Sequence, residues 1–167
     1  MSHTICALVV VGPVDTERAE SVGLRAVLTH EDISVFPIDH YFSAYWAATR
    51  GNHAQLDVPE GIVSESVTFP GEAVLHDLVR EVTGRRGPRF AIVQTDYFAG
   101  TGGQWAAAFD GEERLTPDRA SINQALAALG VRATATMDEF DVIGLGGFRS
   151  NPDHLQVYAS LCDELGV

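Results

Sequence analysis

The chain has 167 residues, of which 46% are hydrophobic and 20% charged, and its formal net charge is -12. This length and composition are typical of a single globular domain, here over residues 1–167, that needs no disulfide or metal cross-link to bury a core. The acidic balance argues against binding to nucleic acid or to an anionic membrane surface, because both kinds of partner require clustered basic residues. We therefore expect any macromolecular partner to be a basic protein.

The first third of the chain predicts two strands and two helices. Ile5–Val11 is a continuous apolar run, which favours a central strand covered on both faces. A short helical turn capped by Asp15 and Thr16 is expected to extend to Val22, and residues 25–32 form a short strand or a loop. Ile33–Phe36 predicts the second strand. A helix should follow, with Asp39 as its N-cap and Gly51 at its end.

The middle of the chain adds a strand, a helix and a hairpin. After a polar loop over residues 52–61, Ile62–Phe69 partly alternates and predicts an edge strand. Glu72–Thr83 carries an apolar stripe at helical spacing, and Gly84 is expected to end that helix. In Phe90–Asp110, two apolar runs flank the glycine-rich stretch Ala99–Gly103, which predicts a central β-hairpin with a long, flexible tip.

The glycine-rich tip does not have the context of a phosphate-binding loop. Such loops lead from a strand into a helix and commonly carry a lysine. Here a strand is expected to follow the glycines, and the sequence contains no lysine at all. The tip is therefore predicted to be a hairpin connection.

The C-terminal third predicts two more helices and one more strand. Thr116 and Pro117 favour the start of a helix that ends at Gly130. Residues 131–137 alternate and predict a strand, and Asn151-Pro152 should begin the last helix. Together these elements predict an α/β (α+β) fold, with a mixed sheet centred on the hairpin and about four helices packed on it.

Residues 138–149, with the sequence DEFDVIGLGGFR, form a second unusual stretch. Its glycines lack the third spaced glycine of a dinucleotide fingerprint, so they are expected to permit a turn. Asp138, Glu139 and Asp141, together with Asp96, either supply paired carboxylates for acid–base or metal chemistry or serve as caps and solvated side chains. The six histidines are scattered without ligand spacing, so we predict no metal and no cofactor.

The candidate ligand- or partner-binding residues are Asp96, Tyr97, Gln104, Trp105, Asp141 and Arg149. In the predicted hairpin Tyr97 and Trp105 share one face, and an aromatic pair beside an amide and a carboxylate suits a small ligand or a protein anchor. The alternative is that both aromatic side chains pack in the core. We expect residues 95–105 and 138–149 to lie side by side, with Arg149 as the counter-ion of Asp96 or Asp141. No pattern identifies a catalytic residue.

Two segments carry a resemblance to known proteins. TDYFAGTGGQWAA, from Thr95 to Ala107, and DEFDVIGLGGFR resemble two blocks of small uncharacterised bacterial proteins, which are similar in size and acidity to immunity proteins of bacterial toxin systems. Ala99 stands where glycine is expected in the first block. The resemblance implies a non-catalytic binding protein of immunity type that acts on a basic protein partner. The alternative is a small-molecule-binding protein or an enzyme with its site at the 95–105 hairpin tip.

The cysteines and the N-terminus bear on the compartment. Cys6 and Cys162 each lie in an apolar pattern, which favours buried, reduced thiols over a disulfide. The apolar run near the N-terminus is too short to span a membrane and has neither the basic flank nor the cleavage site of a signal peptide. We therefore expect a cytoplasmic protein.

Overall fold

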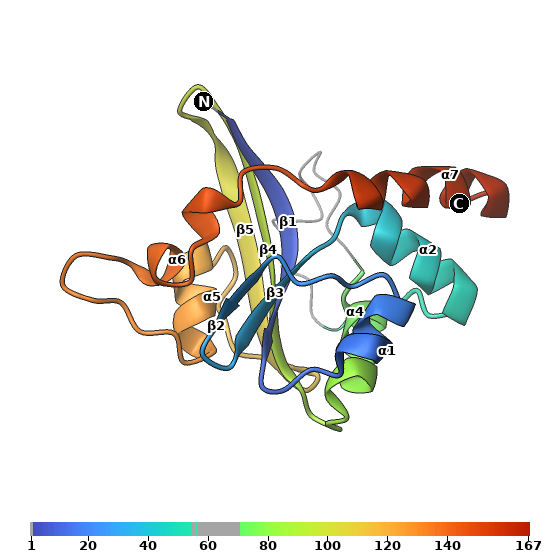
Figure 1. Cartoon of the computed structure of the whole chain (residues 1–167), viewed down its shortest axis with the longest axis horizontal. Coiled ribbons are helices and arrows are strands. Elements are labelled where there is room, and N and C mark those ends of the chain that lie inside the picture. Colours follow the sequence, from blue (N-terminus) through green and yellow to red (C-terminus); the bar gives the residue numbers. More distant parts are fainter. Residues whose placement is uncertain (1, 55, 57–70) are drawn as a thin grey trace.

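The computed structural model describes residues 2–54, 56 and 71–167. Its centre is one sheet in the order β2-β3-β1-β4-β5-β6, with helices on both faces (Figure 1). The strands are β1 Ser2–Val11, β2 Leu28–His30, β3 Ile33–Pro37, β4 Arg89–Phe98, β5 Thr101–Asp110 and β6 Glu113–Arg114. The expected α+β fold is confirmed, and β1 and the β4–β5 hairpin are central.

The described helices lie between and after the strands along the chain. They are α1 Thr16–Ser21, α2 His40–Arg50, α4 Glu72–Thr83, α5 Ile122–Ala128, α6 Glu139–Val142 and α7 Val157–Leu165. Two 3-10 helices, η1 Leu145–Gly147 and η2 Asp153–Gln156, lie in the C-terminal third. The four main helices that the sequence predicted correspond to α2, α4, α5 and α7.

Strand directions are more uniform than the mixed sheet that was expected. All paired strands among the described residues run antiparallel. The only parallel pairing in that part of the chain is the isolated bridge between Thr4 and Ser150. Tight turns join β2 to β3 and β4 to β5, and such short connections are possible only between antiparallel strands.

Alternation along the strands divides the core into two layers. Leu8, Phe90 and Phe109 point to the face covered by α1, α2, α4 and α7. Val9, Ala91 and Ala108 point to the face covered by α5 and α6 (Figure 1). Because both faces are covered, the middle of β1 is buried at every position, which explains its continuous apolar run.

Local signals located several helix ends correctly. Asp15 caps α1, and Asp39 caps α2 by accepting a hydrogen bond from the Phe42 backbone N–H at 2.7 Å. Gly51 and Gly84 end α2 and α4 in the left-handed conformation. The edge strand predicted at residues 62–69 lies outside the described residues.

The start of α5 corrects the sequence prediction. Ser121, not Thr116, is the N-cap, and it forms a capping box with Gln124. The Thr116 hydroxyl accepts a hydrogen bond from the Ala108 backbone N–H at 3.2 Å, so it is committed to the sheet. The helix therefore begins five residues beyond its local signal, because Thr116 is bonded to β5.

The strand predicted over residues 131–137 is also wrong. Residues 132–138 are exposed and form an irregular loop, in which the Thr134 hydroxyl accepts from the Met137 backbone N–H at 3.0 Å. No described strand lies beside this segment, and an alternating pattern without a neighbour has no ladder to join.

The segment before α7 lies beside the N-terminal half of β1, where β3 does not pair with this strand. The Arg149 carbonyl accepts from the Thr4 N–H at 2.9 Å. Asn151 does not cap the last helix as predicted. Its side chain instead accepts from the Cys6 N–H at 3.2 Å and donates to the Ile38 carbonyl at 2.9 Å. These bonds fix the path by which the chain passes from the α6 side of the sheet to the α7 side (Figure 1).

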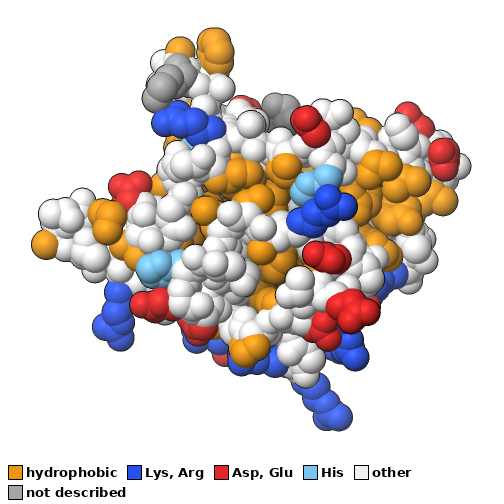
Figure 2. Space-filling model, viewed as in Figure 1, with side chains coloured by type: hydrophobic (Ala, Val, Ile, Leu, Met, Phe, Trp, Pro, Cys, Tyr) orange, Lys and Arg blue, Asp and Glu red, His pale blue; other side chains and the backbone are white. Residues whose placement is uncertain are grey.

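One face of the molecule carries an apolar patch. Figure 2 shows hydrophobic side chains gathered over α2 and α7, whose exposed apolar residues include Tyr41, Val157 and Leu165. Cys6 and Cys162 are buried and outside any disulfide, as predicted. None of the helices in the described ranges is both long and apolar enough to cross a membrane.

Candidate functional site

The hairpin tip is a tight turn and not the long, flexible connection that was predicted. The strands extend to Phe98 and resume at Thr101, so only Ala99 and Gly100 form the turn. Their φ angles are 53° and 79°, and two successive positive values are typical of a type I′ turn. Gly102 has a φ of 148°, and a Cβ there would collide with the Asp96 carbonyl oxygen.

The register that this turn imposes separates the predicted site residues. Thr95 pairs with Gln104, and Gln94 pairs with Trp105. Paired residues share a face, so Tyr97 and Gln104 point to the α5–α6 side, whereas Asp96 and Trp105 point to the other. The prediction that Tyr97 and Trp105 share a face is therefore wrong, because it assumed a longer tip and a different register.

Tyr97 and Gln104 line a cavity of about 320 Å³ between the hairpin and the segment that contains α6. The other lining residues are His3, Thr95, Ile122, Asn123, Asp138 and Phe140. The two unusual sequence blocks therefore meet at this cavity, as their predicted proximity requires.

His3 joins three elements at one side of the cavity. Its Nδ1 lies 2.7 Å from the Thr95 hydroxyl oxygen, and its Nε2 lies 3.2 Å from the Leu145 carbonyl oxygen. Because a carbonyl only accepts, Nε2 carries the proton in that contact. The ring also lies 5.5 Å from the Phe140 ring. His3 of β1 thus contacts β4, η1 and α6.

Gln104 joins the hairpin to α5. Its Oε1 accepts from the Ile122 backbone N–H at 2.8 Å, and its Nε2 donates to the Tyr97 hydroxyl at 3.3 Å. The first bond satisfies an N–H in the first turn of α5 that has no partner within the helix. Gln104 therefore has a structural role whether or not it meets a ligand.

Asn123 and Asp138 form the opposite wall. Asn123 accepts from the Phe140 N–H at 2.9 Å and donates to Asp138 at 3.0 Å. Asp138 also caps α6 by accepting from the Asp141 N–H at 3.0 Å. The hydrogen bond from the Asp141 backbone, and then that from Asn123, lower the pKa of the Asp138 carboxyl below its usual value.

The remaining predicted residues lie away from the cavity lining. Asp96 and Asp141 are exposed, and the Trp105 ring packs close to Gly103. Arg149 contributes its backbone carbonyl to the contact with Thr4. The proposed ion pair of Arg149 with Asp96 or Asp141 stays a prediction, as does the role of all six residues in binding.

Sequence reasoning did not identify His3 or Asn123. His3 lies 92 positions from Thr95, and Asn123 reaches Phe140 across 17 positions. Neither belongs to a spaced motif, and a lone histidine near an N-terminus carries no local signal. Only the folding of β1 against β4 brings the His3 ring to Thr95.

The polar side chains of the cavity are largely satisfied by neighbouring residues. Its histidine, glutamine and asparagine are each hydrogen-bonded at both polar side-chain atoms. Within the described ranges, no three or more His, Cys, Asp or Glu side chains lie close enough together to hold a metal ion. The arrangement leaves Tyr97, Phe140 and the exposed oxygens of Asp138 for contact with another molecule.

Comparison with models of known protein families, with curated proteins and with solved structures gives no significant match.

Proposed function

We propose that this chain is a non-catalytic bacterial binding protein of the immunity type, which binds a basic protein through the cavity face formed by β4, β5 and α6. One observation carries the proposal. The polar side chains around the cavity are hydrogen-bonded to one another and hold the two unusual sequence blocks together. Such a network makes a rigid recognition surface. The Thr95 hydroxyl beside His3 Nδ1 is part of it, because this hydroxyl is buried, lies 3.1 Å from the His3 carbonyl oxygen and accepts from the Ile5 N–H at 3.2 Å.

Charge supports a basic partner for this face. Asp138 and Asp141 are exposed at its rim, and the whole chain carries a net charge of -12. Complementary charge accelerates association and disfavours acidic competitors. Tyr97 and Phe140 are half-buried, and aromatic side chains at the centre of an acidic rim are typical of binding hot spots.

The proposal also includes a cytoplasmic location, without binding to nucleic acid or membrane. Two buried thiols outside any disulfide agree with a reducing compartment. The 23 acidic residues outnumber the 11 basic residues, and this balance opposes contact with phosphate backbones.

Binding to a basic protein encoded beside this chain tests the proposal. The dissociation constant should rise about tenfold in Tyr97→Ala and about threefold in Asp141→Asn, since one loses an aromatic anchor and the other a rim charge. Asp163→Asn, an exposed carboxylate on α7, is the matched control and should leave it unchanged. Equal affinities of Tyr97→Ala, Asp141→Asn and the parent protein would exclude this face as the interface.

A second candidate function is the binding of a small molecule in the same cavity. Its volume of about 320 Å³ and its mixed lining of aromatic, apolar and polar side chains support this alternative. A screen of small ligands by NMR would favour it if amide signals of Tyr97 and Phe140 shifted together and saturated. A screen without such shifts, alongside tight binding to the basic protein, would favour the first function.

A further inference from the structure

Five of the eleven basic residues gather around one hollow on the far side of the sheet from the cavity face. The hollow has a volume of about 410 Å³ and lies among α1, α2 and α4. Its lining contains Arg18, Arg50, Arg80, Arg85 and Arg86, with Asp77, Glu81 and Gly84. Five arginines against two carboxylates leave a local charge of +3, in a chain whose net charge is -12.

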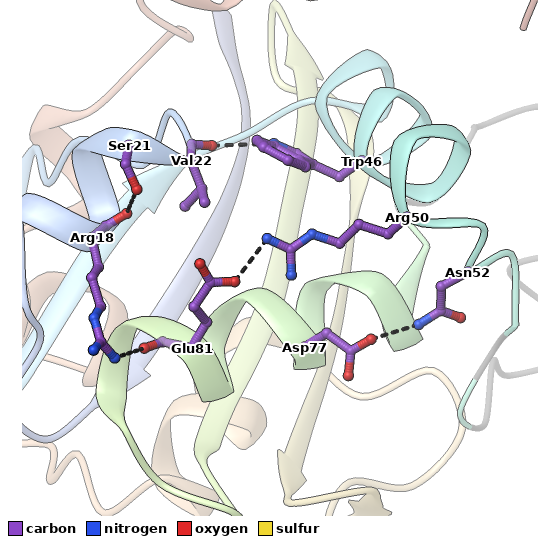
Figure 3. Close-up of polar contacts among 8 residues, drawn as sticks. All are labelled: Arg18, Ser21, Val22, Trp46, Arg50, Asn52, Asp77 and Glu81. Atoms are coloured by element: carbon purple, nitrogen blue, oxygen red, sulfur yellow. Dashed lines mark hydrogen bonds and ion pairs between the residues drawn. The ribbon is translucent and has the colours of Figure 1, made fainter.

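Arg50 is held in a fixed orientation at this hollow. Its Nη2 donates to the Glu81 carboxylate at 2.7 Å, and its guanidinium carbon lies 5.0 Å from the centre of the Trp46 ring. Trp46 is itself anchored, because its indole N–H donates to the Val22 carbonyl at 3.1 Å (Figure 3). The ion pair and the cation–π contact together restrict the arginine side chain before any ligand arrives.

Both carboxylates of the hollow are already engaged. Glu81 accepts from Arg50, and Asp77 accepts from the Asn52 side chain at 2.7 Å (Figure 3). Arg18 donates to the Glu81 backbone carbonyl at 3.5 Å, and its Nε lies 3.6 Å from Asp15. Glu81 therefore offsets Arg50, Asp15 beside the hollow offsets Arg18, and neither forms an ion pair with the other three arginines.

Arg80, Arg85 and Arg86 carry the remaining charge. Each is exposed, and none forms an ion pair with another residue of the described ranges. The Arg85 guanidinium packs directly against Gly12 at the end of β1, where an added Cβ would lie 2.7 Å from its Cζ. Gly12 thus leaves room for the arginine head beside the hollow.

The C-terminus of α4 does not account for this charge. A helix C-terminus carries about half a negative charge, which one nearby arginine more than balances. Arg80 lies in the last turn of α4, whereas Arg85 and Arg86 follow the helix end at Gly84. Three arginines at this helix end exceed what the helix dipole attracts.

We propose that this hollow binds a compact polyanion of the di- or triphosphate type. The planar guanidinium fork matches pairs of phosphate oxygens, and several forks around one hollow match a chain of phosphates. The +3 charge is concentrated at one place and does not form the long basic stripe that a nucleic-acid backbone requires. The net charge of -12 repels a long polyanion but acts far less on a small one.

Calorimetric titration with inorganic pyrophosphate at low ionic strength tests the proposal. Saturable binding to a single site is expected, and it should weaken as sodium chloride is added. The double variant Arg85→Gln/Arg86→Gln should raise the dissociation constant at least about tenfold. The matched control Arg119→Gln/Arg132→Gln removes the same charge at exposed positions outside the hollow and should bind within about twofold of the parent.

Two further titrations identify the source of the phosphates. ADP that binds as tightly as pyrophosphate, or more tightly, supports the site as a reader of a diphosphate, either free or on a nucleotide. Adenosine should not bind. The proposal is overturned if pyrophosphate does not bind, or if the control variant loses as much affinity as Arg85→Gln/Arg86→Gln. Neither result affects the basic-protein proposal, which concerns the opposite face.

Discussion

At the scale of single residues, Ala99 has the least favourable backbone conformation in the hairpin turn. Its φ of 53° lies in the left-handed region, which costs an L-residue with a Cβ roughly 1 kcal/mol. Asparagine tolerates that conformation, and Asn-Gly is the preferred pair in type I′ turns. The glycine expected at this position in the resembling proteins has the same conformational advantage.

We expect Ala99→Asn to raise the free energy of unfolding by about 1 kcal/mol, measured by urea denaturation. Ala99→Gly should gain less, because glycine also adds entropy to the unfolded chain. As a control, Ala127→Gly on the exposed side of α5 should lower stability by up to about 1 kcal/mol. A destabilised Ala99→Asn would contradict the turn type.

Asp39 provides a test of pH dependence. Burial raises the pKa of its carboxyl, although the Phe42 backbone N–H and His40 act in the other direction. A raised native pKa contributes stability that is present below the unfolded pKa and lost as pH rises through the native pKa. Asp39→Asn keeps the cap acceptor without the charge. Its stability relative to the parent should therefore increase from about pH 3 to pH 6, measured by urea denaturation.

Asp138 should behave in the opposite way. Its pKa is lowered by the Asp141 backbone N–H and by Asn123, so its charged form stabilises the native state. That contribution is present above the unfolded pKa and is lost as pH falls through the native pKa. Asp138→Asn should be less stable than the parent at neutral pH, with a difference that shrinks in acid. The same pH trend in both variants would refute the assigned causes.

At the scale of elements, α5 begins where a tertiary contact allows it. Ser121→Ala should cost about 1 kcal/mol and accelerate hydrogen exchange at the Gln124 amide, which Ser121 accepts at 3.1 Å. Thr116→Ala should instead accelerate exchange at the Ala108 amide in β5. Increased exchange throughout α5 in Thr116→Ala, with none in Ser121→Ala, would restore Thr116 as the cap.

At the scale of the whole molecule, the two thiols report different unfolding events. Cys6 lies in β1 between β4 and the Asn151 side chain, whereas Cys162 lies on α7 with its thiol donating to the Tyr41 carbonyl at 3.3 Å. Burial, followed by the charge of Asp39, raises the pKa of both thiols. Both should therefore react slowly with a thiol reagent in the native protein.

The two labelling rates should nevertheless differ. Cys6 becomes accessible only when the sheet opens, so its rate in Cys162→Ala should follow global unfolding. Detachment of α7 alone exposes Cys162, so its rate in Cys6→Ala should be higher and less dependent on urea. Labelling of Cys6 within the dead time under native conditions would contradict its place in the central strand.

The sequence alone determined those features whose causes lie within a few residues. Asp39, Gly51 and Gly84 identify helix ends because capping bonds and left-handed turns involve near neighbours. The apolar runs at residues 5–11, 90–93 and 105–109 identify central strands because burial on both faces requires apolar side chains at successive positions. Cys6 lies in such a run and Cys162 lies on the apolar face of α7, so the burial of both cysteines was predictable.

Only the tertiary structure decided how these elements meet. A two-residue turn in place of a longer tip changes the register, which moves Trp105 to the face opposite Tyr97. The Thr116 hydroxyl caps no helix because it accepts a hydrogen bond from the Ala108 N–H of β5. The alternating residues 131–137 form no strand because no described strand lies beside them. His3 reaches Thr95 across 92 positions, and the arginines of the hollow come from three helices and a loop. Such contacts depend on chain closure over long distances, which no local pattern of residues encodes.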